Sequence, residues 1–197
     1  MLKDIRPAIV STVLLTVLLG IGYPLLVTGI AKLAFPWQAD GSLVRDTATG
    51  RLIGSALIAQ PFARAEYLHP RPSAAGNGYD ATSSGGSNLG PLNPDLTTRI
   101  VKDAAALRAS TGKAEVPDDA VTTSGSGLDP DISPTYAYLQ VDRIAKARGA
   151  TPAAVRAIVA AHVQGPDLGF LGQPRVNVLM TNRALDAAVP KAKPRPS

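Results

Sequence analysis

The chain of 197 residues has no cysteine and only two histidines, His69 and His162. Without thiols it can form neither disulfides nor thiolate metal sites. The two imidazoles stand far apart in the sequence, so the usual zinc-binding spacings are missing. We therefore predict no metal site. The lack of cysteine leaves the redox compartment open.

Aromatic residues are scarce, at 5% of the chain, although the net charge is +5 and the pI is about 9.7. Nucleic-acid-binding proteins usually combine a basic patch with aromatic residues, and the basic residues here are scattered. Their one tight cluster lies among prolines in residues 190–197, where the composition predicts a disordered tail. The sequence therefore predicts no nucleic-acid partner.

Charge is absent from one long stretch. No charged residue lies between Arg6 and Lys32, and thirteen of the intervening residues are Leu, Ile or Val. A helix over this stretch is roughly 38 Å long, which exceeds the hydrocarbon core of a bilayer at about 30 Å. We predict a membrane-spanning helix over residues 9–34, with a short flank at residues 1–8 before it and the interfacial aromatics Phe35 and Trp37 after it.

A secretory signal peptide is the alternative interpretation of the same stretch. Lys3 and Arg6 form a basic leading region, and Gly29-Ile30-Ala31 has small residues at the spacing of a cleavage site. A signal core usually has about 7 to 15 apolar residues, whereas this run continues to Ile30. We therefore favour a membrane anchor, with a kink expected at Pro24 because proline lacks a backbone donor.

Small and hydroxyl-bearing residues recur along this helix at multiples of four residues, namely Thr12, Thr16, Gly20 and Thr28. A narrow helix face lets a partner helix approach closely, so we expect these residues to pack on a partner in the membrane. Gly and Thr are also common in spanning helices without such a role. Both interpretations stay open at this point.

Flanking charge predicts how the helix is oriented. Lys3, Arg6 and the amino terminus precede it, whereas Lys32 alone follows nearby. The excess of positive charge marks the cytoplasmic side. The N-terminus is therefore expected in the cytoplasm and the remainder of the chain outside.

The residues after the anchor, about 160 of them, suit one compact domain. β-structure is predicted at 42–45, at 52–53 and 56–58, and at 175–180. Helices are predicted to begin at Pro94, Pro134 and Pro152, each after a capping Asn, Ser or Thr, and a short last helix is predicted after Asn182. The predicted fold class is therefore α+β: one transmembrane helix followed by a single soluble domain over residues 35–189.

No residue set forms a convincing active site. The chain has neither a phosphate-binding loop nor the Asp-Lys-Thr-Gly sequence of an ATPase that is phosphorylated during its cycle. Ser110 and Lys113 could pair a hydroxyl with an amine for nucleophilic catalysis, but the motifs that accompany such a pair are missing. A membrane-tethered serine-type enzyme that uses these two residues is therefore the alternative function.

Two loops are rich in glycine and in small polar residues, Ser83–Asn93 and Ser124–Pro130. Glycine lets the backbone fold tightly and present its N–H groups, and Ser, Asn and Asp brace such turns with their side chains. These loops are either structural corners of the domain or a surface for a docking partner or an anion. The sequence leaves both interpretations open.

Seven stretches of the chain resemble one family: 54–58, 71–73, 87–94, 121–130, 132–134, 169–172 and 174–178. In these stretches the chain resembles the C subunit of the Kdp potassium-transporting P-type ATPase, the KdpC family. Their order and the single N-terminal span fit as well. Asp131 and the pair Asn182-Arg183 depart from the family pattern.

The resemblance implies a non-catalytic accessory subunit of an ATP-driven potassium uptake pump in the cell (inner) membrane. Its partners would be a channel-like subunit that carries potassium, a P-type subunit that hydrolyses ATP, and membrane lipid. The family is described as stabilising the assembly and as raising the ATP affinity of the hydrolytic subunit. The resemblance implies no tightly bound cofactor, only ATP shared with that subunit.

The resemblance also implies docking or nucleotide-related roles for residues in and near the loops: Ser73, Ser87, Asn88, Gly90, Asn93, Ser126, Gly127, Asp129, Gln140 and Arg143. If the family's nucleotide role is literal, Ser126, Gly127, Gln140 and Arg143 contact ATP, which requires a cytoplasmic domain. If the flanking charges place the domain outside the cytoplasm, its effect on the ATP affinity of the hydrolytic subunit has to pass through the helices as a coupling energy.

Overall fold

The computed structural model describes residues 2–46 and 49–189 and divides the chain into two compact units, Met1–Ser55 and Ala56–Ser197. The predicted tail at residues 190–197 lies outside the described residues. The division falls after Ser55, whereas the predicted soluble domain begins at Phe35.

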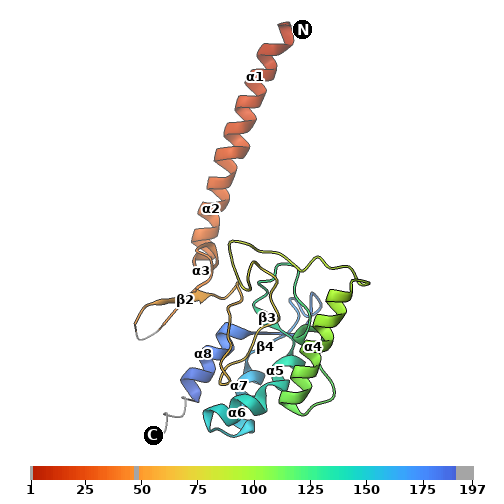
Figure 1. The fold of residues 1–197 in the computed structure, drawn as a ribbon. Coiled ribbons are helices and arrows are strands. Elements are labelled where there is room, and N and C mark those ends of the chain that lie inside the picture. Colours follow the sequence, from red (N-terminus) through yellow and green to blue (C-terminus); the bar gives the residue numbers. More distant parts are fainter. Residues whose placement is uncertain (1, 47–48, 190–197) are drawn as a thin grey trace. The chain divides into compact units, whose positions relative to one another are not determined.

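The first unit is dominated by one long helix, which consists of α1 (Leu2–Val17), the π-helical turn η1 (Leu18–Gly22) and α2 (Tyr23–Ala34) (Figure 1). Residues Lys3–Ala34 are long and apolar enough to cross a membrane, and their most apolar window has no buried residue. The predicted long apolar helix at the N-terminus is thus present, and it is a candidate membrane span.

A short helix and a hairpin complete the first unit. They are α3 (Pro36–Ala39), β1 (Leu43–Arg45) and β2 (Leu52–Ser55), with the two strands antiparallel and Leu43 opposite Ser55. The indole N–H of Trp37 donates to the Leu43 carbonyl at 3.0 Å, which ties α3 to the hairpin. The two predicted strands are therefore present, but the second ends at Ser55 and does not continue to Ile58.

The sheet of the second unit is small. It contains β3 (Asp131–Ile132), β4 (Val163–Gln164) and β5 (Arg175–Asn177) in the antiparallel order β3-β5-β4. The predicted strand over 175–180 is wrong in its second half, because the Asn177 side chain accepts from the Met180 N–H and starts α8 (Val178–Ala188). Asn182 is therefore inside α8, and the predicted cap at Asn182 is wrong.

Three other helices of this unit begin where their capping residues predict: α4 (Pro94–Thr111), α5 (Pro134–Leu139) and α7 (Pro152–Ala161). The unit also contains a short 3-10 turn, η2 (Asp118–Ala120), and α6 (Val141–Arg148), which follows Gln140 without a side-chain cap. The side chains of Asn93, Ser133 and Thr151 each accept from a backbone N–H of the first turn, which satisfies one of the unpaired donors there. These three starts are confirmed.

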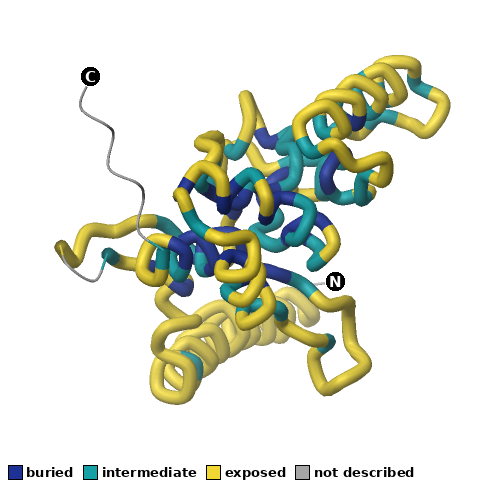
Figure 2. The backbone as a smooth tube through the Cα atoms, turned by 90° about the horizontal axis from the view of Figure 1, so that it is seen from below, coloured by how far each residue is buried: buried dark blue, intermediate teal, exposed yellow. Residues whose placement is uncertain are grey.

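The hydrophobic core lies where α5 to α8 meet the sheet, and Figure 2 shows buried backbone gathered inside this unit. Val141, Ile144, Val155, Val176 and Leu185 are fully buried. Leu68, also fully buried, brings an irregular segment into the same core. His162 is only half-buried at the end of α7, where its Nδ1 lies 2.8 Å from the Ile158 carbonyl oxygen.

Candidate functional site

The membrane helix contains a π-helical turn immediately before Pro24. Proline has no N–H, so one carbonyl in the preceding turn loses its usual donor. In the wider turn the Tyr23 N–H donates to the Leu18 carbonyl, and the helix continues through this point (Figure 1). The structure therefore accommodates Pro24 with a π turn, at the place where the sequence predicts a kink.

This turn also changes which residues share a helix face. Residues four apart drift by about 40° per step, which would place Thr28 about 160° from Thr12 in a regular α-helix. A π turn contains one extra residue, so the angle between residues before and after it is smaller by roughly 100° than in a regular α-helix. The predicted packing residues Thr12, Thr16, Gly20 and Thr28 therefore fall within roughly 60° of one another.

The two glycine-rich loops of the second unit interlock. The Ser73 hydroxyl donates to the Gly127 carbonyl at 2.6 Å and accepts from the Tyr79 N–H at 2.8 Å. The Ser126 carbonyl accepts from the Gly85 N–H at 2.9 Å. Residues 73–86 and 124–127 thus form one hydrogen-bonded layer, hereafter the interlocked loops.

Gly127 is required at the centre of the interlocked loops. Its φ is +65°, and a Cβ at this position would lie 2.6 Å from the Gly85 carbonyl oxygen and 2.7 Å from the Ala75 nitrogen. Both distances are too short for any side chain, and the left-handed backbone also favours glycine. The glycine therefore serves the close packing of the loops on one another.

The stretch from Ser87 to Asn93 lies beyond the interlocked loops. Ser87 is half-buried, whereas Asn88 and Gly90 are exposed. Asn88 has a left-handed backbone with a φ of +53°, and Asn93 is used as the cap of α4. Of these residues, only Asn93 has a defined structural role, at the start of α4, and the proposed docking or nucleotide-related role of the loop stays a prediction.

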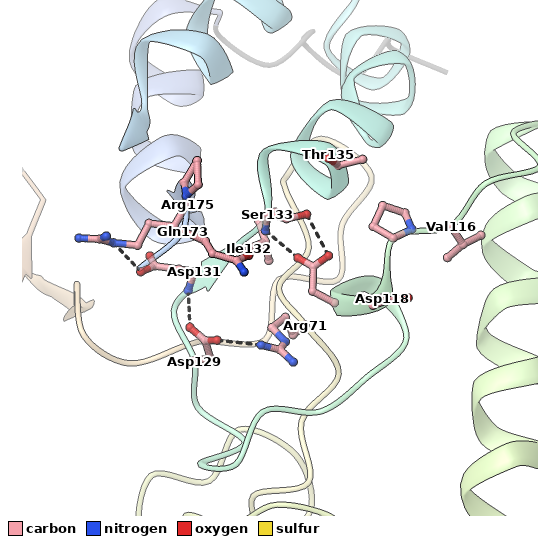
Figure 3. Close-up of a pocket in the computed structure, with 13 residues that line it drawn as sticks. Arg71, Val116, Asp118, Asp129, Asp131, Ile132, Ser133, Thr135, Gln173 and Arg175 are labelled. Atoms are coloured by element: carbon pink, nitrogen blue, oxygen red, sulfur yellow. Dashed lines mark hydrogen bonds and ion pairs between the residues drawn. The ribbon is translucent and has the colours of Figure 1, made fainter. Parts of the chain in front are cut away.

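Asp129 belongs to a polar cavity of about 600 Å³, drawn in Figure 3. Its carboxylate pairs with Arg71 at 3.1 Å and also accepts from the Asp131 N–H at 3.0 Å. Arg175 lies 3.5 Å from the Asp131 carboxylate on the opposite side. Asp118 and Asp119 line the cavity as well, so it has four carboxylates and two guanidinium groups.

Most of the charged side chains in this cavity already have hydrogen-bond or ion-pair partners within the domain. Arg71 also donates to the Thr122 and Thr123 carbonyls, and Asp119 accepts from the backbone and hydroxyl of Ser133. Burial, with a further contribution from Asp129, raises the pKa of Asp131. In the described part of the chain, no three His, Cys, Asp or Glu side chains are arranged to hold a metal ion.

Gln140, which precedes α6, and Arg143, within α6, are hydrogen-bonded to the backbone of residues 65–69, hereafter the strap. Gln140 is 3% exposed, and its amide both accepts from the His69 N–H at 2.8 Å and donates to the His69 carbonyl at 3.1 Å. Arg143 donates to the carbonyls of Ala65 and Tyr67 at 2.6 and 3.0 Å and to Gln140 Oε1 at 2.6 Å.

Asn182 forms the same pair of hydrogen bonds with Leu68 that Gln140 forms with His69, the next residue of the strap. Its side chain accepts from the Leu68 N–H at 2.7 Å and donates to the Leu68 carbonyl at 3.0 Å. The two side-chain amides thus pair with consecutive backbone amides as a neighbouring strand would. Sequence reasoning missed this role, because a polar residue inside a helix gives no sign of a distant backbone partner.

The structure therefore brings together only part of the predicted site. Ser73, Ser126 and Gly127 meet in the interlocked loops, and Asp129 joins the polar cavity. Gln140 and Arg143 are engaged by the strap. Of the alternative catalytic pair, Ser110 donates to the Leu107 carbonyl of its own helix at 3.0 Å, and Lys113 follows the left-handed Gly112 that ends α4.

The chain matches known proteins over nearly its whole length. A family model described as "K+-transporting ATPase, c chain" matches residues 5–187. The "Potassium-transporting ATPase KdpC subunit" of Caulobacter sp. (strain K31) is 63% identical over 190 residues, which is 96% of each chain. Proteins of the same name from Beijerinckia indica and Koribacter versatilis are 56% and 48% identical, over 98% and 99% of this chain.

Proposed function

Because the chain belongs to the KdpC family of potassium-transporting ATPase subunits, we propose that it is an accessory subunit of an ATP-driven potassium uptake pump. The match over residues 5–187 carries this conclusion, since it includes both the membrane helix and the domain. The match covers 96% and 98% of the length of the Caulobacter and Beijerinckia relatives.

The proposed partners are a channel-like subunit that carries potassium and a P-type subunit that hydrolyses ATP. The helix face of Thr12, Thr16, Gly20 and Thr28 packs on their membrane helices, and the other side of the helix contacts lipid. The π turn supports this assignment, because it aligns the four residues over a length that a regular helix would not. The chain stabilises the assembly through this contact.

We further propose that the chain raises the ATP affinity of the hydrolytic subunit without holding the nucleotide itself. The N–H groups of Gln140 and Arg143 already donate to carbonyl oxygens of the strap. If these N–H groups bound a nucleotide instead, the strap carbonyls would lose their hydrogen bonds. Each buried carbonyl left without a donor costs about 1–3 kcal/mol. Direct contact through these two residues is therefore the less favourable route.

The indirect route is a coupling energy between the docked domain and the nucleotide site. Typical couplings of about 1–3 kcal/mol change an affinity by roughly 5- to 150-fold, which suits an accessory subunit. The interlocked loops are suited to transmit it, because Gly127 packs closely on the facing backbone at their centre and accepts a hydrogen bond from Ser73. We place the domain outside the cytoplasm, in keeping with the flanking charges of the helix.

Two glycine variants in a reconstituted pump test this proposal. Gly127→Ala forces a Cβ into the facing backbone, whereas Gly125→Ala places it in open space within the same loop. We expect the KM for ATP of the complex to rise severalfold with Gly127→Ala and to stay unchanged with Gly125→Ala. If the KM is the same with and without the chain, the proposed effect on ATP affinity is wrong.

A further inference from the structure

A second cavity, of about 300 Å³, shares no lining residue with the polar cavity of Figure 3. Three prolines and three aromatic side chains form most of its wall: Pro61, Pro70, Pro72, Phe62, Tyr79 and Tyr136. We call it the proline–tyrosine pocket. Its size is at the lower end of small-ligand sites, and rigid apolar walls with a few polar groups are typical of them. Tyr79 belongs to the interlocked loops through its backbone N–H, and His69 belongs to the strap, but none of the side chains that line the pocket is used in the function proposed above.

Tyr136 supplies a hydrogen-bond donor to this pocket. The residue is only 4% exposed, yet its hydroxyl is not among the fully buried unpartnered atoms and so reaches the solvent of the pocket. This hydroxyl has no hydrogen-bond partner in the part of the chain that the structure describes. Burial raises the pKa of Tyr136 to about 12, so the phenol keeps its proton. A hydroxyl that opens into a pocket and has no protein partner is a donor available to a ligand.

His69 supplies an acceptor to the same pocket. Its Nε2 lies 3.1 Å from the Arg64 carbonyl oxygen, and because a carbonyl only accepts, this nitrogen carries the proton. Burial and the neighbouring Arg143 lower the pKa of His69, which keeps the ring neutral. Nδ1 is therefore an acceptor, and Gln140 fixes the His69 backbone on both sides.

We propose that the proline–tyrosine pocket binds an uncharged carboxamide attached to an apolar body. The Tyr136 hydroxyl donates to the carboxamide oxygen, and His69 Nδ1 accepts from its N–H, while the prolines and rings contact the apolar part. The guanidinium of Arg143 near Tyr136 and His69 disfavours a cation here. A carboxylate lacks the N–H that His69 needs. The carboxamide can come from a peptide segment of a partner subunit or from a free small molecule.

Three probes of one shape test this chemistry: benzamide, benzoate and benzylamine are neutral, anionic and cationic. Each is titrated into the purified full chain in detergent and followed by saturation-transfer NMR. We expect benzamide to bind at least tenfold more tightly than either charged analogue. Equal binding of a charged analogue, or no binding of benzamide, would overturn the proposal without any variant.

Tyr136→Phe removes only the unpartnered hydroxyl and should weaken benzamide binding roughly tenfold, the effect of one lost hydrogen bond in a buried site. Tyr138→Phe is the matched control on the same helix, because its ring lies beneath Arg156 at 4.9 Å and outside this pocket. Unchanged binding to Tyr136→Phe would contradict the site.

The same titration on the assembled pump distinguishes the two sources of the carboxamide. If a peptide segment of a partner subunit occupies the pocket, benzamide no longer binds there. If the natural ligand is a free small molecule, the pocket stays open and benzamide still binds.

Discussion

At the scale of single residues, buried polar side chains hold the domain together through backbone carbonyls. Arg148 is the clearest case, since its side chain is fully buried. It donates to the Glu66, Leu185 and Val189 carbonyls at 2.8, 3.1 and 2.8 Å and pairs with Asp186 at 2.9 Å. One guanidinium thus joins the strap to α6 and α8.

Removing this guanidinium should destabilise the domain strongly. We expect Arg148→Met to lower the free energy of unfolding by about 3 kcal/mol, because it leaves several carbonyls and one carboxylate without their donor. Arg156→Met is the control, since it removes only an exposed contact with the Tyr138 ring, worth about 1 kcal/mol or less. Thermal unfolding followed by circular dichroism compares the two. Equal losses of unfolding free energy in the two variants would show that the hydrogen bonds of Arg148 add no more stability than the exposed contact of Arg156.

His69 should make the stability depend on pH. Burial and Arg143 lower its pKa in the folded domain, whereas the unfolded chain has the ordinary value of about 6.5. Below that value the unfolded state binds more protons, so the free energy of unfolding falls as the pH falls toward the depressed folded-state pKa. We expect the melting temperature to drop between pH 7.5 and 5.5, and to drop less in His69→Gln. An identical drop in the variant would contradict this assignment.

At the scale of elements, the sequence predicted helices better than strands. Capping side chains at Asn93, Ser133 and Thr151 lie next to the N–H groups that they satisfy, so a local pattern was enough. The strands β3 and β4 have two residues each and were missed, because their partner in β5 is distant in sequence. Within the candidate site, the same limit hid the strap, whose partners are Gln140 between α5 and α6, Arg143 on α6 and Asn182 on α8, all more than 70 residues away.

The membrane helix gives a prediction at this scale. Thr16→Leu with Gly20→Leu should widen the proposed packing face and release the chain from its partners during purification in mild detergent. A Cβ added at residue 20 has one neighbour within 4 Å, Thr16 Cγ2 at 3.9 Å, so the helix itself has room for the substitution. Gly29→Leu is the control, because it adds the same bulk off that face. Unaltered co-purification of the double variant would show that the face is wrongly chosen.

At the scale of the whole molecule, the lack of cysteine offers a direct test of orientation. A single cysteine in place of Leu92, which is 95% exposed, is the only thiol of the chain. In sealed right-side-out vesicles we expect a membrane-impermeant maleimide to label this position, because the domain is proposed to lie outside. A cysteine in place of Lys3 should be labelled only after the vesicles are opened. The reverse pattern would put the domain in the cytoplasm and restore direct contact with ATP.

This chain belongs to a family of potassium-transporting ATPase subunits, and we propose that it is membrane-anchored and acts only within such a pump. The most direct measurement is to purify the tagged full chain from its own membranes, identify by mass what comes with it, and assay ATP hydrolysis. We predict that a channel-like subunit and a P-type ATPase subunit accompany it in fixed ratio, with hydrolysis that depends on them. A chain that purifies alone, and that hydrolyses ATP or another substrate unaided, would contradict the account.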